Sequence, residues 1–382
     1  IPDSGVLKKA RYQVATLNDL GVVAELVVIT PEKQNEEPES GTITYFYYGK
    51  LDRKSLFARL RRAQRIRRIL HDIITPMTHD DIFYYRGLEF IVLYYPLAFF
   101  RPFRRCRILS EHQSVEINQH LLYHSYGAAV IDVLTGSLIT GQSDGIIGVT
   151  EEITAFWKKR LPNPDIPRIT IPNGFNVGSV AVRTPPRFDS REIHLLFVGN
   201  VSRWHGLDRM VQGIADYRGP VSIHLHIVGD GDELEQIKKE KNTRAPTADI
   251  HFYGFMSGPA LTAMFDSCHL AIGSLGLHRN RMNQASSLKV REYCSRGIPF
   301  ILSNEDPDFP DTFPYCLHVD PTDAPVPLEE VISFAGQACE NPDHPGIMRA
   351  YAQEHLDWHV KGQRLITFIG TIPDARAGQR RT

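Results

Sequence analysis

The stretch Met282–Ile301, MNQASSLKVREYCSRGIPFI, decides the fold class because it contains a polar loop, a helix and a strand in immediate succession. Ser286 or Ser287 is a typical N-cap for the charged helix, and Gly297 is a typical C-terminal stop. The apolar segment Ile298–Leu302 then predicts a short strand. The N–H groups that open such a helix bind anions, although a serine cap by itself is more often structural.

Strands and helices alternate outward from this stretch, which predicts an α/β protein whose parallel sheets are built from βαβ units. The second half of the chain predicts strands at 193–198, 223–228, 250–253, 270–272 and 298–302, with helices at 207–215, 233–239, 258–265 and 288–296. The first half predicts helices at 7–20 and 125–138, and strands at 24–29, 90–93, 107–109 and 145–149. A proline-rich run, Val180–Ser190, joins two doubly wound domains, and ligands of such sheets bind beyond the carboxyl ends of the strands.

Length and composition are those of a folded globular protein with more than one domain, because the chain has 382 residues, of which 42% are hydrophobic and 23% charged. The five cysteines show no CxxC spacing, so they indicate neither disulfides nor a zinc site, and a reducing cytosol fits best. No apolar run reaches the roughly 18 residues of a membrane span. The chain starts at Ile1 on an expected loop, so we expect that a first strand precedes it.

Two basic segments in the first half predict attachment to an anionic membrane surface. Arg53–Arg68 is a basic amphipathic helix, and Leu93–Arg107 mixes aromatic residues with arginines. A solvated helix that packs one face on its own domain remains an equal alternative for the first segment. Nucleic acid is not expected as a partner, because the aromatic and basic mixture suits a headgroup layer better than a base-reading surface. We therefore expect a cytoplasmic protein that lies peripherally on the inner face of the plasma membrane.

Several short motifs occur together in an ordered set. The second half contains LLFVGNVSRWHGLDRMV, HIVGDGDELEQI, IHFYGFM, FDSCHLAIGSL and SSLKVREYCSRGIPFI, and the first half contains SGVLKKARYQVATLNDLG, ILSEH, SDGIIGVTEEI and ITIPNGF. In this order the chain resembles the retaining GT-B glycosyltransferases, in particular glycosyltransferase family 4 (glycosyl transferases group 1). The resemblance implies two Rossmann-like domains that face each other across a cleft. Residues 1–186 would bind the acceptor, 187–345 the nucleotide sugar, and the helical segment 346–382 would pack back toward the N-terminal domain.

The resemblance also implies where the diphosphate and ribose of a donor bind. Glu292 matches the second glutamate of the family's E-x7-E motif, which accepts hydrogen bonds from the ribose hydroxyls; a first-turn glutamate is otherwise favoured by the helix dipole. The backbone N–H groups of Ser287, Leu288 and Lys289 would meet the pyrophosphate. Gly5 would let the backbone approach the diphosphate, or it is an ordinary glycine at a helix entry.

Three positions depart from the family pattern by losing charge. The first glutamate of the motif falls on Gln284, and the phosphate-binding arginine and lysine fall on Asn200 and His205. Gln284 still donates and accepts hydrogen bonds to sugar hydroxyls, while Arg203, with His205 when protonated, would neutralise part of the diphosphate.

One candidate residue of the sugar site lies in the first half. His112, in the segment SEH, matches the family histidine near the donor sugar. Its alternative is a strand-end histidine that bonds a loop. Asn173 and Gly174 read first as a turn and only second as cleft residues.

The expected function is transfer of a hexose from a nucleotide diphosphate sugar to a lipid-linked or growing glycan acceptor with retention of configuration, in cell-surface polysaccharide or glycolipid biosynthesis. Gln284 and His112 would act at the reacting sugar. No metal or other cofactor is expected, because the cleft elements contain no DxD-type site. The alternatives are a non-catalytic nucleotide-sugar-binding relative and a nucleotide-sugar 2-epimerase. A NAD-dependent dehydrogenase is disfavoured because GDGDEL lacks the full G-x-G-x-x-G and follows an interior strand.

Overall fold

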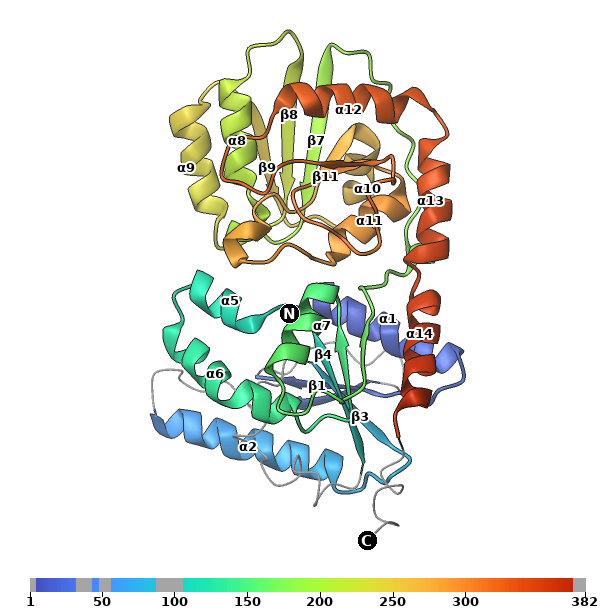
Figure 1. Ribbon diagram of the computed structural model, residues 1–382. Helices are drawn as coiled ribbons and strands as arrows, with labels where there is room; N and C mark the ends of the chain where they lie inside the picture. Colours follow the sequence, from blue (N-terminus) through green and yellow to red (C-terminus); the bar gives the residue numbers. More distant parts are fainter. Residues whose placement is uncertain (1–4, 32–42, 48–55, 87–105, 374–382) are drawn as a thin grey trace. The chain divides into compact units, whose positions relative to one another are not determined.

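A computed structural model describes residues 5–31, 43–47, 56–86 and 106–373 of the chain. The chain forms two compact units (Figure 1), each with its own parallel sheets and helices. Unit 1 contains residues 1–172 and 361–382, and unit 2 contains residues 173–360. None of the described helices is long and apolar enough to cross a lipid bilayer.

Unit 1 contains a four-stranded parallel sheet in the order β3-β4-β5-β6 and a separate parallel pair, β1-β2. Its strands are β1 (Leu26–Thr30), β2 (Ile43–Tyr47), β3 (Ile82–Arg86), β4 (Arg107–His112), β5 (Gly145–Gly148) and β6 (Arg168–Thr170). Its helices are α1 (Gly5–Asp19), α2 (Leu56–Ile74), α5 (Glu116–Leu122), α6 (Tyr126–Thr140), α7 (Glu151–Arg160) and most of α14 (Trp358–Thr371).

Apolar residues of the last helix complete the core of unit 1. Leu365 and Phe368 of α14 are buried in one cluster with Leu109 of β4 and Ile147 of β5. Gly145 allows this close packing, because a Cβ there would lie 2.7 Å from side-chain carbons of Leu109 and of the residue that follows α14. The end of the chain thus packs on the sheet of unit 1.

Unit 2 contains a six-stranded parallel sheet in the order β12-β11-β10-β7-β8-β9. Its strands are β7 (Glu192–Val198), β8 (Ser222–Val228), β9 (Asp249–Gly254), β10 (Leu270–Ile272), β11 (Phe300–Leu302) and β12 (Cys316–His318). Its helices are α8 (Leu207–Asp216), α9 (Leu234–Arg244), α10 (Gly258–Ser267), α11 (Leu288–Arg296), α12 (Leu328–Glu340) and α13 (His344–His355), with short 3-10 helices η2 (Val177–Ser179), η3 (Arg203–His205) and η4 (Leu277–Asn280).

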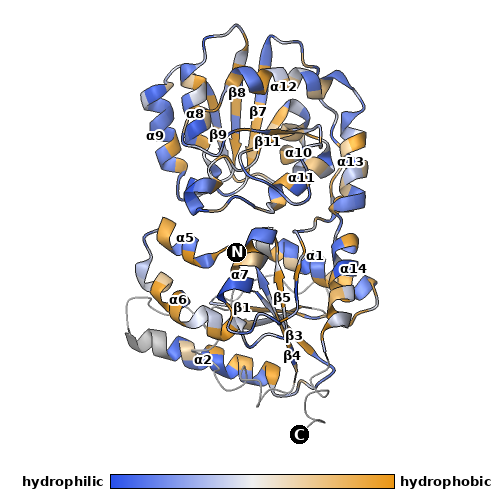
Figure 2. Cartoon of the chain, viewed as in Figure 1, coloured by the Kyte–Doolittle hydropathy of each residue, from blue (hydrophilic) through white to orange (hydrophobic). Residues whose placement is uncertain are grey.

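The strand order of unit 2 positions its ligand site. Numbered along the unit, the order is that of the doubly wound dinucleotide-binding fold, in which the chain reverses direction between the first strand, β7, and the fourth, β10. Hydrophobic residues run along β7 and β8 (Figure 2), as expected for strands that are covered on both faces. The loops that follow β7 and β10 therefore meet at the reversal point, where such sheets bind ligands.

The proline-rich connection packs on unit 2 through Arg183. This buried side chain donates from Nε to the carbonyl oxygen of Gly297 (3.0 Å) and from Nη1 to that of Cys268, while its own N–H donates to Arg296 O (2.9 Å). The guanidinium is bonded inside unit 2, so this part of the connection belongs to unit 2. That unit begins at Asn173, whereas the prolines predict a boundary at residue 186.

Some expected elements of the first half lie outside the described residues. These are the strand at 90–93, the first residues of the basic segment Arg53–Arg68, and nearly all of Leu93–Arg107. The rest of the basic segment forms part of α2, on which Arg61, Arg65 and Arg68 are exposed.

Candidate functional site

The loops after β7 and β8 lie against each other at the carboxyl end of the sheet in unit 2. Gly199 N donates to Val228 O (2.9 Å), and Val201 N donates to Asp230 O (2.8 Å). Gly229 has φ +131°, and a Cβ on it would overlap the carbonyl oxygen of Gly199. The GDG motif is therefore required for this close backbone packing.

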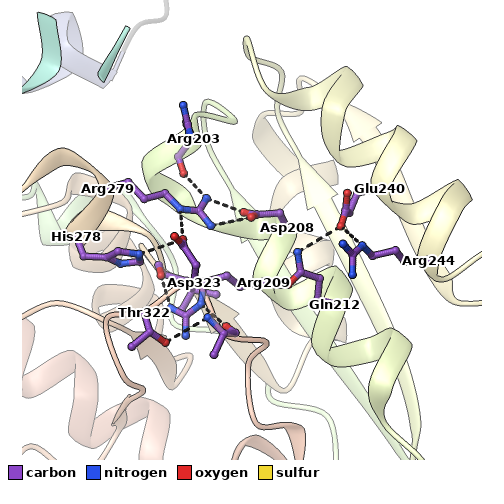
Figure 3. Close-up of polar contacts among 12 residues, drawn as sticks. Arg203, Asp208, Arg209, Gln212, Glu240, Arg244, His278, Arg279, Thr322 and Asp323 are labelled. Atoms are coloured by element: carbon purple, nitrogen blue, oxygen red, sulfur yellow. Dashed lines mark hydrogen bonds and ion pairs between the residues drawn. The ribbon is translucent and has the colours of Figure 1, made fainter. Parts of the chain in front are cut away.

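A network of arginine side chains holds the loop after β7 in place (Figure 3). Arg279 of η4 binds both carboxylate oxygens of Asp208 (2.8 and 2.7 Å), donates from Nε to Asp323 (2.7 Å), and donates to the carbonyl oxygen of Arg203 (3.0 Å). These carboxylates raise the pKa of Arg279 despite its burial, so it stays charged. The Arg209 guanidinium donates hydrogen bonds to the carbonyl oxygens of Leu275, Asp320 and Ala324, and so joins the loops that contain them.

Lys289 places a buried ammonium group beside this loop. Its Nζ lies 3.9 Å from the ring centroid of Phe197 and 3.7 Å from where a Cβ of Gly199 would be. Among the described residues, Nζ has no hydrogen-bond partner. Burial lowers the pKa of Lys289 well below its usual value, so an anion placed here would recover the energy lost on desolvation.

His205 lies next to Lys289 and is buried. Its Nδ1 accepts a hydrogen bond from Ser202 N (3.2 Å), and its Nε2 has no partner in the described part of the chain. Burial, and then the charge of Lys289, lowers the pKa of His205 well below its usual value. The imidazole is thus neutral near pH 7, and it adds no positive charge, unlike the protonated form considered from the sequence.

The N-terminus of α11 is fixed from outside the helix. Ser287 is the N-cap residue, but its side chain makes no capping hydrogen bond, and the expected cap from Ser286 is absent because its Oγ accepts instead from Asn173 N (2.7 Å). The first-turn N–H groups, including those of Leu288 and Lys289, are left without a side-chain cap, as at an anion site.

A buried arginine anchors α11 from its other side. Arg291 donates from Nε to Asn173 O (3.0 Å) and from Nη2 to Asp306 (2.6 Å) and Asp308 (2.7 Å). The two aspartates raise the pKa of Arg291, although burial alone would lower it. The IPNGF loop is therefore a structural brace for α11, and Asn173 and Gly174 do not form the turn that the sequence predicts.

Glu292 and Gln284 both have intramolecular partners. Glu292 accepts a hydrogen bond from Arg296 Nε (2.8 Å), and its side chain is 23% exposed. Gln284 donates from Nε2 to the exposed Glu305 (3.0 Å), so a carboxylate lies next to the position where the family motif has its first glutamate.

The remaining candidates of unit 2 are on the surface of the β7 loop. Asn200 is exposed and donates from Nδ2 to Ser202 Oγ (2.6 Å). Arg203 is exposed, and in Figure 3 its side chain points away from the Arg279 network. The guanidinium is therefore available to solvent and to a ligand.

Two candidates lie in unit 1. His112 ends β4, is buried against Trp157 (ring centroids 4.4 Å apart), and lies 3.3 Å from Ser110 Oγ through Nε2. Burial lowers the pKa of His112 to about 3, so its ring is neutral. Gly5 is the exposed first residue of α1. Next to His112, Glu111 forms a buried ion pair with Lys9, and this pair joins α1 to β4.

Sequence reasoning missed the side chains that organise the site. Lys289 was considered only for its backbone N–H, while Arg279 and Arg291 were not considered. The partners described for the two arginines lie 15–118 residues away along the chain, so no local sequence signal marks them.

The fold is GT-B, with a Rossmann-like parallel sheet in each unit, as expected from the sequence. Residues 181–314 match the family model described as Glycosyl transferases group 1, which confirms the resemblance over that stretch. A search of curated protein sequences finds no match.

Solved structures of glycosyltransferases are similar over nearly the whole chain. Sucrose-phosphate synthase (tll1590) from Thermosynechococcus elongatus is 15% identical with a TM-score of 0.69, covering 96% of this chain and 93% of its own. The lipopolysaccharide outer core galactosyltransferase WaaB is 14% identical with a TM-score of 0.61 and coverages of 95% and 94%. Anabaena Alr3699/HepE in complex with UDP is 11% identical with a TM-score of 0.63 and coverages of 91% and 100%.

Proposed function

We propose that this protein is a retaining glycosyltransferase that moves a hexose from a nucleotide diphosphate sugar to a lipid-linked or growing glycan acceptor, in the synthesis of a cell-surface polysaccharide or glycolipid. The family match supports a sugar transferase. The UDP bound to HepE and the lipopolysaccharide acceptor of WaaB support a nucleotide donor and a lipid-linked acceptor. Retention rests on the resemblance of the motifs.

One observation carries the donor site: the buried Lys289 ammonium next to the backbone of Gly199 and the uncapped start of α11. A diphosphate held by N–H groups at this helix start would also meet Lys289. The resemblance implies a phosphate-binding cation in the loop after β7. His205 in that loop is neutral, so Lys289 of α11 would supply this charge instead. Arg203 at the loop surface would supply a second charge.

The test of the donor site is a calorimetric titration with uridine and guanosine diphosphates. A charge-assisted hydrogen bond contributes about 1.5–3 kcal/mol, so Lys289→Met should weaken the nucleotide that the parent binds by roughly 10- to 100-fold. Lys238→Met is the matched control, since Lys238 also lies over a phenylalanine ring but is partly exposed and paired with Glu235. If both variants bind the nucleotide with equal affinity and melt normally, Lys289 does not contact the donor.

A transfer assay separates the proposed enzyme from its two alternatives. We expect release of nucleoside diphosphate only when acceptor is present. The anomeric configuration of the sugar should be the same in the product as in the donor. The transfer rate should be undiminished in EDTA, since no metal is proposed for the transfer. Conversion of the nucleotide sugar without acceptor would indicate a 2-epimerase. Tight binding of the nucleotide sugar without formation of nucleoside diphosphate would indicate a non-catalytic relative. The loss of charge at Asn200 and Gln284 would explain that result.

A membrane surface is the proposed place of action. Helix α6 exposes apolar side chains, among them Val130, Val133 and Leu134, of which Leu134 is 72% exposed. Helix α2 of the same unit exposes Arg61, Arg65 and Arg68. Exposed apolar and basic side chains together suit the headgroup layer of an anionic bilayer.

A further inference from the structure

A cluster of histidines lies on one face of the sheet in unit 2, near the amino-terminal ends of β7, β8 and β9. Parallel pairing aligns His194 with His224, His224 with Asp249, and His226 with His251. Side chains two residues apart on a strand share a face, so Glu192 joins His194 on the same side. The imidazoles of His194 and His224 stack with ring centroids 4.3 Å apart and planes 8° apart.

Three of these side chains converge through potential metal ligands. His194 Nε2 lies 3.7 Å from Glu192 Oε1, and His224 Nε2 lies 3.7 Å from Glu192 Oε2. The three ligand atoms all lie within 4.8 Å of one another. Tetrahedral zinc with ligands at about 2.0–2.1 Å separates them by about 3.3–3.4 Å. The Glu192 side chain, 57% exposed, can move to shorten its two distances, and rotation of one of the stacked imidazoles brings the two Nε2 atoms to the same separation.

The other nitrogen of each imidazole is already bonded, which orients the two rings. His224 Nδ1 bonds the Asp249 carboxylate, so its proton is on Nδ1, and Nε2 keeps a lone pair that has no hydrogen-bond partner within the described residues. His194 Nδ1 is 3.0 Å from His226 Nε2, whose Nδ1 is 2.9 Å from the Tyr253 hydroxyl. When His226 donates from Nδ1 to Tyr253, its Nε2 accepts a hydrogen bond from His194 Nδ1. The lone pair of His194 Nε2 then faces Glu192, as that of His224 Nε2 does. Carboxylate and histidine partners of this kind hold metal-binding imidazoles in the required tautomer.

The charge state of the cluster also suits a cation. A neutral imidazole is the form that binds metal, and metal binding must otherwise displace a proton. Glu192 supplies a negative charge at the open side of the cluster, where solvent has access.

We propose that Glu192, His194 and His224 bind a divalent transition metal ion of the Zn²⁺ class, with water as the remaining ligand. Two imidazoles and one carboxylate with an open position are a ligand set that zinc accepts. The site lies at the opposite ends of the strands from Lys289, so it is separate from the proposed donor site. The ion would join the first residues of β7 to β8, directly after the proline-rich connection.

The experiment is a titration of the full, chelator-treated protein with Zn²⁺, followed by the visible spectrum of the Co²⁺ form. The parent should bind one ion per chain, and Co²⁺ should give the intense bands of four-coordinate geometry. Glu192→Gln and His224→Gln should each weaken Zn²⁺ by at least about 10- to 100-fold, and Asp249→Asn by roughly that factor, because it orients His224. Binding should also raise the melting temperature of the parent by mass action.

His318→Gln is the matched control, since His318 is an exposed histidine on β12 at the other edge of the same sheet. It should bind Zn²⁺ as the parent does. Glu192 is largely exposed, so Glu192→Gln tests the site even if His224→Gln fails to fold. Failure of the parent to bind Zn²⁺ at micromolar concentration, or unchanged affinity in Glu192→Gln, would overturn the proposal, and neither result depends on sugar transfer.

Discussion

Glu292 has a partner within its own helix and a proposed partner in the ligand. Its carboxylate accepts from Arg296 one turn later, and it is partly exposed on the same helix whose N-terminus faces the proposed diphosphate. A carboxylate has two oxygens and several lone pairs, so the bond to Arg296 leaves acceptor capacity for the ribose hydroxyls.

Glu292→Ala should weaken nucleotide binding by roughly 10- to 100-fold, since each charge-assisted hydrogen bond contributes about 1.5–3 kcal/mol. The fold should survive, because Arg296 keeps its contacts with Thr262 Oγ1 (3.5 Å) and the Phe265 ring (4.5 Å) when Glu292 is removed. Titration calorimetry and a melting curve on the same sample measure both quantities. Glu235→Ala, which removes an exposed glutamate from α9, is the control. A normal melting curve with parental affinity would make Glu292 a surface residue only.

Single residues were predictable from the sequence where a local signal marks their role. The helix stop at Gly297 is confirmed in the structure, because glycine adopts the left-handed backbone that ends the helix. The turn predicted at Asn173 is wrong, because the backbone there bonds to Ser286 and Arg291 of the distant α11 region and forms no local turn. The histidine cluster was not predictable, because His194 and His224 are brought together only by strand register. The same holds for Lys289 of α11, whose role depends on Phe197 of β7 and on Gly199 directly after that strand.

At the scale of elements, η3 and the loop before it depend on a clamp from η4. Arg279 binds Asp208 and Asp323 and also the carbonyl oxygen of Arg203 (Figure 3), so one side chain sets the position of the whole loop. The loop carries Asn200, Arg203 and His205, and its position decides whether they reach a ligand together.

Arg279→Met should therefore weaken nucleotide binding without removing a ligand contact. We expect a loss of roughly 10-fold, because the partly buried Asp208 would be left without its cation, and the loop would lose its bond to Arg203. Arg279→Lys should restore little, since lysine cannot make the forked contact. Arg244→Met, on the exposed pair with Glu240, is the control. Parental affinity in Arg279→Met would show that the loop keeps its position without the clamp.

Helices α2 and α6 are predicted to bind an anionic membrane surface. Reversing charge at Arg61, Arg65 and Arg68 should release the protein from phosphatidylserine vesicles, because each basic residue near the surface contributes about 1 kcal/mol. Leu134→Glu should have a similar effect through α6, while Val182→Glu, at an exposed valine of unit 2, should have none. Co-sedimentation at low and high salt measures the binding. Pelleting that changes with neither variant nor salt would exclude both helices as a membrane surface.

Elements of unit 2 were predicted more completely than those of unit 1. Strands β7 and β8 are buried and mostly apolar toward their carboxyl ends, and they appear where the sequence places them. In unit 1, β2, β3 and β6 were missed, because they are short, and β2 and β3 are rich in tyrosine, with few fully buried residues. The expected strand at 90–93 lies outside the described residues and stays a prediction.

At the scale of the whole molecule, buried histidines set an acid limit on stability. Burial lowers the pKa of His226 and of His269 to about 4, and that of His112 to about 3, from an ordinary 6.5. Between these values and 6.5 the unfolded chain binds protons that the folded chain excludes. The stability due to neutral histidines is therefore fully present above pH 6.5 and falls as the pH falls toward 4.

Melting curves in EDTA at pH 7.5, 6 and 5 should show a falling transition temperature over that interval. His226→Gln should reduce the slope, whereas His318→Gln, which alters an exposed histidine, should leave it unchanged. A transition temperature that is constant from pH 7.5 to 5 would contradict the predicted proton uptake.

The packing of Leu365 and Phe368 against β4 and β5 has a consequence for synthesis on the ribosome. Unit 1 is interrupted by all of unit 2, so its last core residues are translated after residue 360. At about 5–20 residues per second, unit 2 takes on the order of 10–40 seconds to emerge. Throughout that time the first 172 residues wait with Leu109 and Ile147 uncovered, while unit 2, which is continuous, is able to fold as soon as it leaves the exit tunnel.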